Sequence, residues 1–253
     1  MRKKMQWLAG VGAATMLAGF AQADVYSDAL GDHAWAGAEV DIGSVIITND
    51  LSNITFQIVC DPASDFVTNR FANYEIGIQR NGGAGGQTAI NGTFGTGNPA
   101  AGTPWGNSVG ISSGMNFFIG SFLAGSGFDG GAELFSYDTV GGWTKIGPTS
   151  VTTQTLNSTQ FTFPLSALGL SVGDSFLFDV WTTFGSPQSA YDALSRATDA
   201  TAPGTPFAPV TPYDAATVSG STFASQAYTV VPEPGFLGLL GLAGLALRQR
   251  CRR

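Results

Sequence analysis

The chain has 253 residues, of which 43% are hydrophobic and 11% are charged, and it contains 35 glycines and two cysteines. Its formal net charge of −7 argues against nucleic acid and anionic lipid as partners, because both attract basic surfaces. Many glycines with few charges are typical of turn-rich extracellular β proteins and not of helical ones.

Residues 1–23 have the pattern of a secretory signal peptide. A basic start at Arg2, Lys3 and Lys4 is followed by an apolar stretch, Trp7 to Phe20. Small residues at Ala21 and Ala23 then form a cleavage site, which predicts Asp24 as the first mature residue. An uncleaved N-terminal helix acting as an anchor is the alternative.

Residues 24–230 are predicted to form one all-β domain, a single antiparallel β-sandwich with a jelly-roll-like arrangement. The clearest strand pattern runs from Asn53 to Cys60, where every second residue is apolar, as a strand with one buried face requires. Glycine and asparagine turns separate the segments. The other expected strands are Ile42 to Thr48, Tyr74 to Arg80, Asn116 to Ala124, Ala132 to Asp138, Gly142 to Ile146, Val151 to Leu156, Thr159 to Phe163, Ser175 to Phe184 and Gln226 to Val231.

Two stretches of this domain lack the alternating pattern. Asn81 to Gly114 is rich in Gly, Asn and Thr, and loops of such length are more often functional or disordered than not. Pro187 to Pro212 contains several prolines and a short predicted helix from Ser189 to Ala197. We expect this stretch to cross the domain before the final strand.

The C-terminal segment, residues 231–253, combines a short motif, an apolar run and a basic end. The motif is Val231-Pro232-Glu233-Pro234-Gly235, and the apolar run extends over 12 residues from Phe236 to Leu247. With flanking residues the run reaches the length of about 20 residues that a membrane span needs. The arginines that follow would hold this end in the cytoplasm; they are Arg248, Arg250, Arg252 and Arg253.

This order of elements resembles the PEP-CTERM sorting signal of Gram-negative bacteria. The resemblance implies an exosortase-type membrane protease as a partner, which recognises Pro232-Glu233-Pro234 and removes the tail. It also implies a protein tethered to the inner membrane by its C-terminal helix before processing, and placed at the cell surface or outside the cell afterwards. A permanent single-span anchor is the alternative.

The two terminal segments hold most of the positive charge. They contain seven of the 11 Lys and Arg residues but one of the 18 acidic residues, so the body has four basic and 17 acidic residues and a net charge near −13. Cys251 lies in the tail, which leaves Cys60 alone in the body. A lone cysteine excludes an internal disulfide and is expected to be a buried, inert thiol.

No catalytic motif in the body has the context that its chemistry requires. Gly110-Ile-Ser-Ser-Gly114 matches a nucleophile elbow, and Gly125-Ser-Gly-Phe-Asp-Gly130 matches a dinucleotide fingerprint. Each is followed by a strand pattern where a helix is needed. His33 is the only histidine, which excludes a His-rich metal site. From the failed motifs and this single histidine, we predict no catalytic residues.

The acidic body still allows divalent cations, and calcium in particular, because calcium needs only oxygen ligands. Asp28 and Asp32 flank a turn glycine near the mature N-terminus and are the candidate ligands. The alternative is a solvated acidic edge with no bound ion.

Trp105, Trp181 and Asp179 are the candidate ligand-binding residues. In Ser175 to Phe184 the apolar face consists of Phe176, Phe178 and Val180, so Trp181 lies on the opposite face with Asp179. An aromatic ring beside a carboxylate suits a sugar, and Trp105 lies in the long loop. The alternative is that both tryptophans are packing residues.

The order of strands and turns in the body also resembles DOMON-like domains and family-nine carbohydrate-binding modules. The likeness covers roughly Asp24 to Asp192. It rests on Gly31-Asp32, the two strands from Asp41 to Ile58, Tyr74 to Ile78, the hairpin at Trp143, Phe161 to Gly169 and the strand Ser175 to Val180. It implies a β-sandwich that binds sugars or haem, and haem is not expected here because no histidine follows His33. In that family the tyrosine-containing strand runs into an aspartate-rich turn, whereas here it runs into Arg80-Asn81-Gly82, so we expect an altered ligand-binding edge.

These observations predict an exported, non-enzymatic surface or matrix protein whose β domain binds carbohydrate, with exopolysaccharide as the expected partner. A purely structural matrix protein without a small ligand is the first alternative. A secreted glycan-active hydrolase is the second, and it would require a pair of carboxylates in a cleft.

Overall fold

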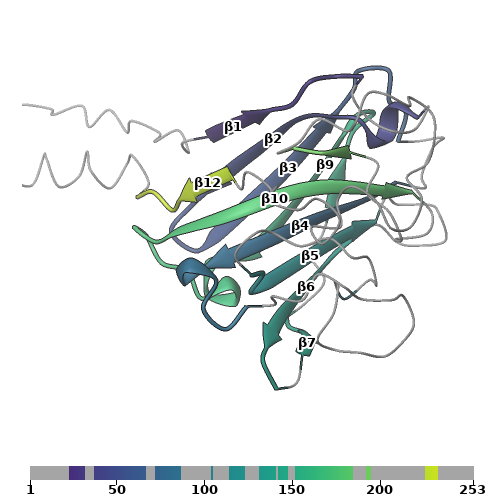
Figure 1. Ribbon diagram of the computed structural model, residues 1–253. Coiled ribbons are helices and arrows are strands. Elements are labelled where there is room, and N and C mark those ends of the chain that lie inside the picture. Colours follow the sequence, from purple (N-terminus) through teal and green to yellow (C-terminus); the bar gives the residue numbers. More distant parts are fainter. Residues whose placement is uncertain are drawn as a thin grey trace, which may run out of the picture.

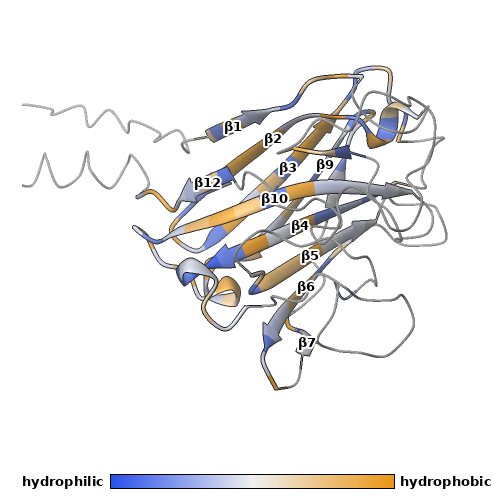
Figure 2. Cartoon of the chain, viewed as in Figure 1, coloured by the Kyte–Doolittle hydropathy of each residue, from blue (hydrophilic) through white to orange (hydrophobic). Residues whose placement is uncertain are grey.

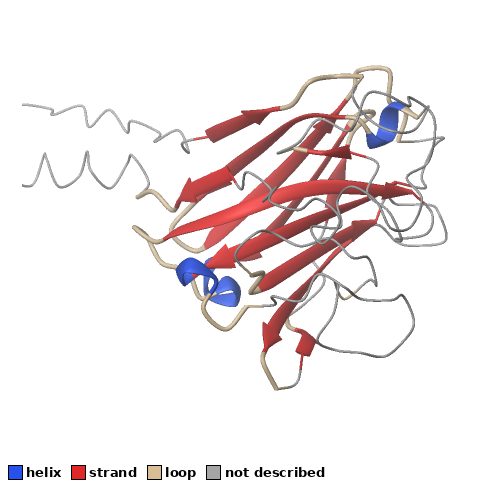
Figure 3. Ribbon diagram, viewed as in Figure 1, coloured by secondary structure: helices blue, strands red, loops and turns tan. Residues whose placement is uncertain are grey.

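The computed structural model describes residues 23–31, 37–66, 72–86, 104, 114–122, 131–140, 142–147, 152–184, 192–194 and 226–232. Within these residues the protein is all-β and consists of two antiparallel sheets (Figure 1). The helical elements among them are three short 3-10 turns, η1 (Ala38–Val40), η2 (Asn81–Gly83) and η3 (Leu165–Leu168) (Figure 3). No helix in the described part is long and apolar enough to cross a membrane.

The first sheet has five strands in the order β1-β2-β3-β9-β8. Its central strand β3 is antiparallel to both β2 and β9. The strands are β1 (Ala23–Ser27), β2 (Ile42–Asn49), β3 (Asn53–Cys60), β8 (Thr152–Gln154) and β9 (Ser158–Pro164).

The second sheet has seven strands in the order β11-β10-β4-β5-β6-β7, with β12 paired to the first half of β10. Its longest strand, β10, is antiparallel to β4 from Phe176 opposite Arg80 to Phe184 opposite Ala72. The strands are β4 (Ala72–Arg80), β5 (Phe117–Phe122), β6 (Gly131–Asp138), β7 (Gly142–Lys145), β10 (Ser175–Phe184), β11 (Asp192–Ala193) and β12 (Gln226–Thr229).

One hydrophobic core joins the two sheets in a sandwich-like arrangement. The alternating apolar residues of β3 and those of β10 belong to the same buried cluster. Figure 2 shows hydrophobic residues along both strands. Tyr26 of β1 meets Phe178 of β10 edge to face, with ring centroids 4.9 Å apart. The Tyr26 hydroxyl also donates a hydrogen bond to the Ala227 carbonyl of β12, 2.7 Å away. Contacts of this kind hold the edges of the two sheets together.

All ten strands expected from alternation are present, most of them within one or two residues of the predicted bounds. The structure adds β1 and β11, whose sequences are too short for their pattern to be distinctive. The predicted helix from Ser189 to Ala197 is wrong at Asp192–Ala193, which pairs with β10 as a strand. The expected signal helix and membrane helix, and the motif from Glu233 onward, lie outside the described residues.

Cys60 ends β3 on the buried face and is a free thiol. Its Sγ lies 3.5 Å from the Glu39 carbonyl and 3.7 Å from the Tyr74 hydroxyl. Burial raises the pKa of the thiol far above its usual value. The expected buried thiol is confirmed, and because only a thiolate reacts readily, it is held in an unreactive form.

Candidate functional site

The tryptophan predicted as a ligand platform is fully buried. Trp181 does lie on the opposite face of β10 from Phe178, as the alternation indicates, but its exposed fraction is 0%. Its indole N–H donates to the Glu75 carboxyl group at 2.8 Å, and the Thr183 hydroxyl donates to the same group at 3.1 Å. The interpretation of Trp181 as an exposed sugar platform is therefore wrong for this structure.

Trp181 packs among other side chains on the same face of the second sheet. Phe118 lies against Trp181 and Trp143 at centroid distances of 6.2 Å each. Met115 lies over Gly77, where a β-carbon would come within 2.6 Å of the Met115 sulfur and 3.1 Å of the Trp181 ring. Phe118 of β5 and Met115, two residues before β5, are themselves fully buried, so this part of the second face is not open to a ligand.

Asp179 is also removed from solvent. Its exposed fraction is 1%, and its Oδ1 accepts a hydrogen bond from the Val180 N–H at 2.8 Å. A side chain in this state does not present a carboxylate to a ligand in solution, so the prediction for Asp179 is wrong as well. Trp105, the third candidate, lies outside the described residues.

The calcium prediction is tested only in part, because Asp32 lies outside the described residues. Asp28 accepts a hydrogen bond from the Ala29 N–H at 2.9 Å, and its own N–H donates to the Gly43 carbonyl. Among the residues that the structure describes, no group of three or more His, Cys, Asp or Glu side chains is arranged to hold a metal ion.

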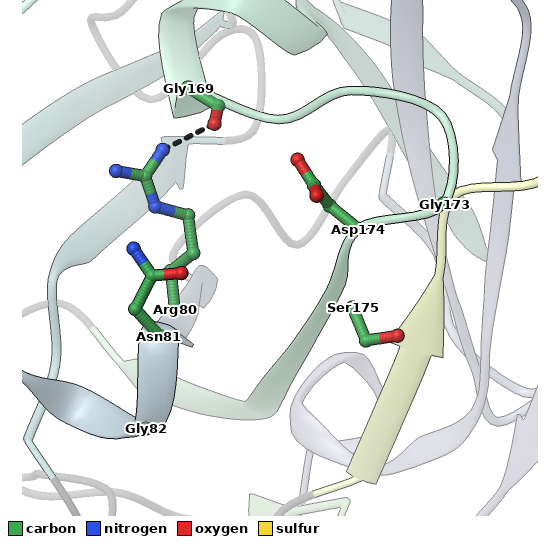
Figure 4. A pocket seen from close by; sticks show the side chains of 7 residues that line it. All are labelled: Arg80, Asn81, Gly82, Gly169, Gly173, Asp174 and Ser175. Carbon is green, nitrogen blue, oxygen red and sulfur yellow. Dashed lines mark hydrogen bonds between the residues drawn. The ribbon is translucent and has the colours of Figure 1, made fainter.

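A polar pocket lies instead where β4 ends and β10 begins. It has a volume of about 380 Å³ and lies between the turn after β4 and the turn before β10 (Figure 4). Seven residues line it: Arg80, Asn81, Gly82, Gly169, Gly173, Asp174 and Ser175. The altered ligand-binding edge that the sequence predicts at Arg80-Asn81-Gly82 falls on this pocket.

Arg80 forms one wall of the pocket and is held in place on several sides. One guanidinium nitrogen, Nη1, donates to the Leu168 carbonyl at 2.8 Å and also to the Gly169 carbonyl. The guanidinium carbon lies 5.6 Å from the centre of the Phe117 ring. These contacts cap the end of η3, and no hydrogen bond of Nη2 or Nε to a described residue accompanies them.

Gly169 makes the close approach of Arg80 to η3 feasible. Its φ of 58° lies in the left-handed region, which favours glycine. A β-carbon on this residue would clash with Arg80 Nη1. The rim of the pocket therefore depends on a glycine that ends the 3-10 turn.

The opposite wall is the turn into β10. Asp174 accepts the Ser171 N–H at 2.8 Å through Oδ2, and Figure 4 shows its carboxylate facing the Arg80 side of the pocket. Ser175 shares a hydrogen bond of 2.8 Å with the Thr229 hydroxyl of β12. Asn81 has a φ of 53°, a conformation that asparagine tolerates better than most residues.

The pocket combines donors and acceptors with little net charge. A guanidinium, a carboxylate, an amide and a hydroxyl meet within one concave site. Its volume falls within the range of about 300–1,000 Å³ that small-molecule sites occupy, but such sites are usually lined by apolar side chains. A polar lining of this kind suits a ligand with many hydroxyl groups better than an apolar one.

Sequence reasoning did not identify this pocket. The one local signal was the turn Arg80-Asn81-Gly82, at which an altered ligand-binding edge was predicted. Asp174 lies far from it in the chain and is placed opposite it only by the pairing of Phe176 with Arg80.

No protein-family model matches this chain, and no curated protein is similar to it. Among solved structures, one described as "pH-induced modulation of Streptococcus parasanguinis adhesion by Fap1 fimbriae" is similar over 67% of this chain and 78% of its own. The identity is 16% and the TM-score is 0.22. At these values the likeness supports no conclusion about function.

Proposed function

We propose that this protein is an exported cell-surface or extracellular-matrix protein whose β domain binds an uncharged polysaccharide without cleaving it. The proposal that it binds a polysaccharide rests on the pocket between Arg80 and Asp174. This pocket offers hydrogen-bond donors and acceptors in a volume of about 380 Å³ at one end of the domain. Sugar hydroxyls can pair with both kinds of group. The single guanidinium and the single carboxylate favour a ligand without net charge.

Binding is a better account of this pocket than hydrolysis. Glycoside hydrolases use two carboxyl groups on either side of the scissile bond, about 5–9.5 Å apart. The residues that line the pocket include one carboxylate, Asp174. The buried Glu75 is committed to Trp181 and Thr183 on the outer face of the second sheet.

Two variants test the pocket while preserving the fold around it. Asn81→Gly keeps the left-handed backbone and removes the amide, and Asp174→Asn keeps an oxygen that can accept the Ser171 N–H. Each is expected to weaken binding to the polysaccharide of the host matrix about tenfold, the loss expected for one polar contact. Affinity electrophoresis or calorimetry with purified polysaccharide measures this loss.

Asp138→Asn is the matched control, because the Asp138 carboxylate also accepts a backbone N–H within a turn, that of Val140 at 2.8 Å in the β6–β7 turn. It should leave the affinity unchanged. Wild-type affinity in both pocket variants would show that the polysaccharide does not bind in this pocket. If the unaltered protein binds no host polysaccharide, the alternative of a structural matrix protein is favoured.

Export rests on the terminal sequences and is tested separately. The sorting segment from Val231 to Arg253 supports processing of a membrane-tethered precursor by an exosortase-type protease. We expect mass spectrometry of the surface-exposed protein to show a chain that begins at Asp24 and lacks the apolar run and the arginines. Recovery of surface protein that still ends at Arg253 would contradict processing.

A further inference from the structure

The two ends of the described domain lie side by side. Ala23, the first residue of β1, is paired with Thr48 near the end of β2. The next residue, Asn49, is hydrogen-bonded to Val231 just after β12. Figure 1 shows the start of β1 and the end of β12 at the same side of the domain. The chain therefore enters and leaves the domain at the turn between β2 and β3.

The Asn49 side chain binds the chain at its point of exit. Its Oδ1 accepts hydrogen bonds from the Tyr228 hydroxyl at 2.7 Å and from the Val231 N–H at 3.1 Å. Its Nδ2 donates to the Val231 carbonyl at 2.8 Å and to the Asp50 carbonyl at 3.0 Å. Both backbone polar groups of Val231 are thus occupied by one amide, an arrangement that we call the Asn49 clamp.

The clamp is partly protected from water. Asn49 is 4% exposed, and Tyr228 and Val230, which precede Val231 in the chain, are 1% and 0% exposed. The bond between Tyr228 and Asn49 is buried, and the two bonds between Asn49 and Val231 are half-buried. Val230 also exchanges backbone hydrogen bonds with the turn before β10, to the Asp174 carbonyl and from the Gly173 N–H. Polar bonds that are shielded from water are costly to open, because the separated groups find little water to replace the lost partner.

A protease commonly holds its substrate as an extended strand through main-chain hydrogen bonds, as other extended-peptide binding sites do. Val231 cannot supply such bonds while the Asn49 clamp is closed. We propose that the Asn49 clamp sets the upstream limit of the segment that a processing protease can engage, so that in the folded protein only the chain after Val231 is available. This inference rests on the proposed sorting function for its biological role, but the clamp itself can be tested without it.

The test uses the full chain and a soluble protease of broad specificity at low concentration, with the new C-termini mapped by mass spectrometry. We expect wild-type fragments of the domain to end at or after Pro232. In Asn49→Ala, cuts should extend into Gln226–Val231 and appear about tenfold faster, as expected for the loss of one or more buried hydrogen bonds.

Asn53→Ala is the matched control, since Asn53 lies at the other end of the same turn and its amide makes only longer bonds of 3.3–3.4 Å to Asp50. It should give the wild-type fragments. Tyr228→Phe removes one bond to Asn49 and should give an intermediate rate, which keeps the test valid if Asn49→Ala does not fold. Unchanged cut sites in folded Asn49→Ala and Tyr228→Phe would overturn the inference.

Failure of the sorting proposal would be seen in the C-terminus of the surface protein, whereas failure of the clamp proposal would be seen in the map of soluble-protease cuts. If the host does not remove the tail, the surface protein retains Arg253 while the soluble-protease map still shifts in Asn49→Ala. If the tail is removed but the map does not shift, the clamp does not limit the protease and the sorting proposal stands.

Discussion

Replacement of Phe178 by alanine is expected to lower the free energy of unfolding by about 4 kcal/mol, the middle of the range for a buried Phe→Ala change. Phe178 is 0% exposed and lies on β10, which is paired there with β4 on one side and β12 on the other. Its ring meets Tyr26 of the other sheet edge to face. The change therefore leaves a cavity and removes a contact between the two sheets.

Urea unfolding followed by far-ultraviolet circular dichroism measures this loss. Val140→Ala is the control, because Val140 is 94% exposed and its truncation should change the free energy of unfolding by less than about 0.5 kcal/mol. Because a domain of this size has a stability of about 5–15 kcal/mol, the Phe178 variant should be visibly destabilised. A loss below about 1 kcal/mol would contradict the shared core.

Replacement of Glu75 by alanine is expected to cost about 3 kcal/mol of folding free energy. The carboxyl group is fully buried on β4 and accepts hydrogen bonds from the Trp181 indole and the Thr183 hydroxyl. Its removal takes the acceptor from two buried donors, and each unsatisfied donor costs about 1–3 kcal/mol. Glu75→Gln retains one oxygen acceptor and should cost about half as much.

Denaturant unfolding with tryptophan fluorescence follows this effect, because the indole of Trp181 loses its partner. Glu133→Ala is the matched control: Glu133 forms a partly exposed ion pair with Lys145, and such pairs contribute about 0–1 kcal/mol. Equal losses in the Glu75 and Glu133 variants would show that the buried carboxyl group is not a structural partner of Trp181.

The strands were predictable because alternation is a local property. In β3 the buried residues Ile54, Phe56, Ile58 and Cys60 occupy every second position, and a period of two places them on one face whatever the rest of the chain does. The same period correctly placed Trp181 opposite Phe178. It could not show that this second face is also buried, because Met115 and Phe118, which pack beside Trp181, come from distant parts of the chain.

Only one wall of the candidate site could be predicted from the sequence. Arg80-Asn81-Gly82 is visible in the sequence, but a pocket needs an opposite wall. Asp174 supplies that wall because β10 pairs with β4, a contact between residues almost a hundred positions apart. Neither the volume nor the balance of charge in the pocket follows from the residues around Arg80 alone.

By itself the sequence determined the all-β class, the bounds of most strands and the strongly acidic composition of residues 24–230, because each depends on neighbouring residues or on composition. Tertiary structure alone decided that Trp181 and Asp179 are buried, that Arg80 faces Asp174, and that Asn49 holds Val231 from 182 positions away. The reason is physical. Local pattern sets the face on which a side chain lies, whereas burial and binding depend on what long-range strand pairing brings against that face.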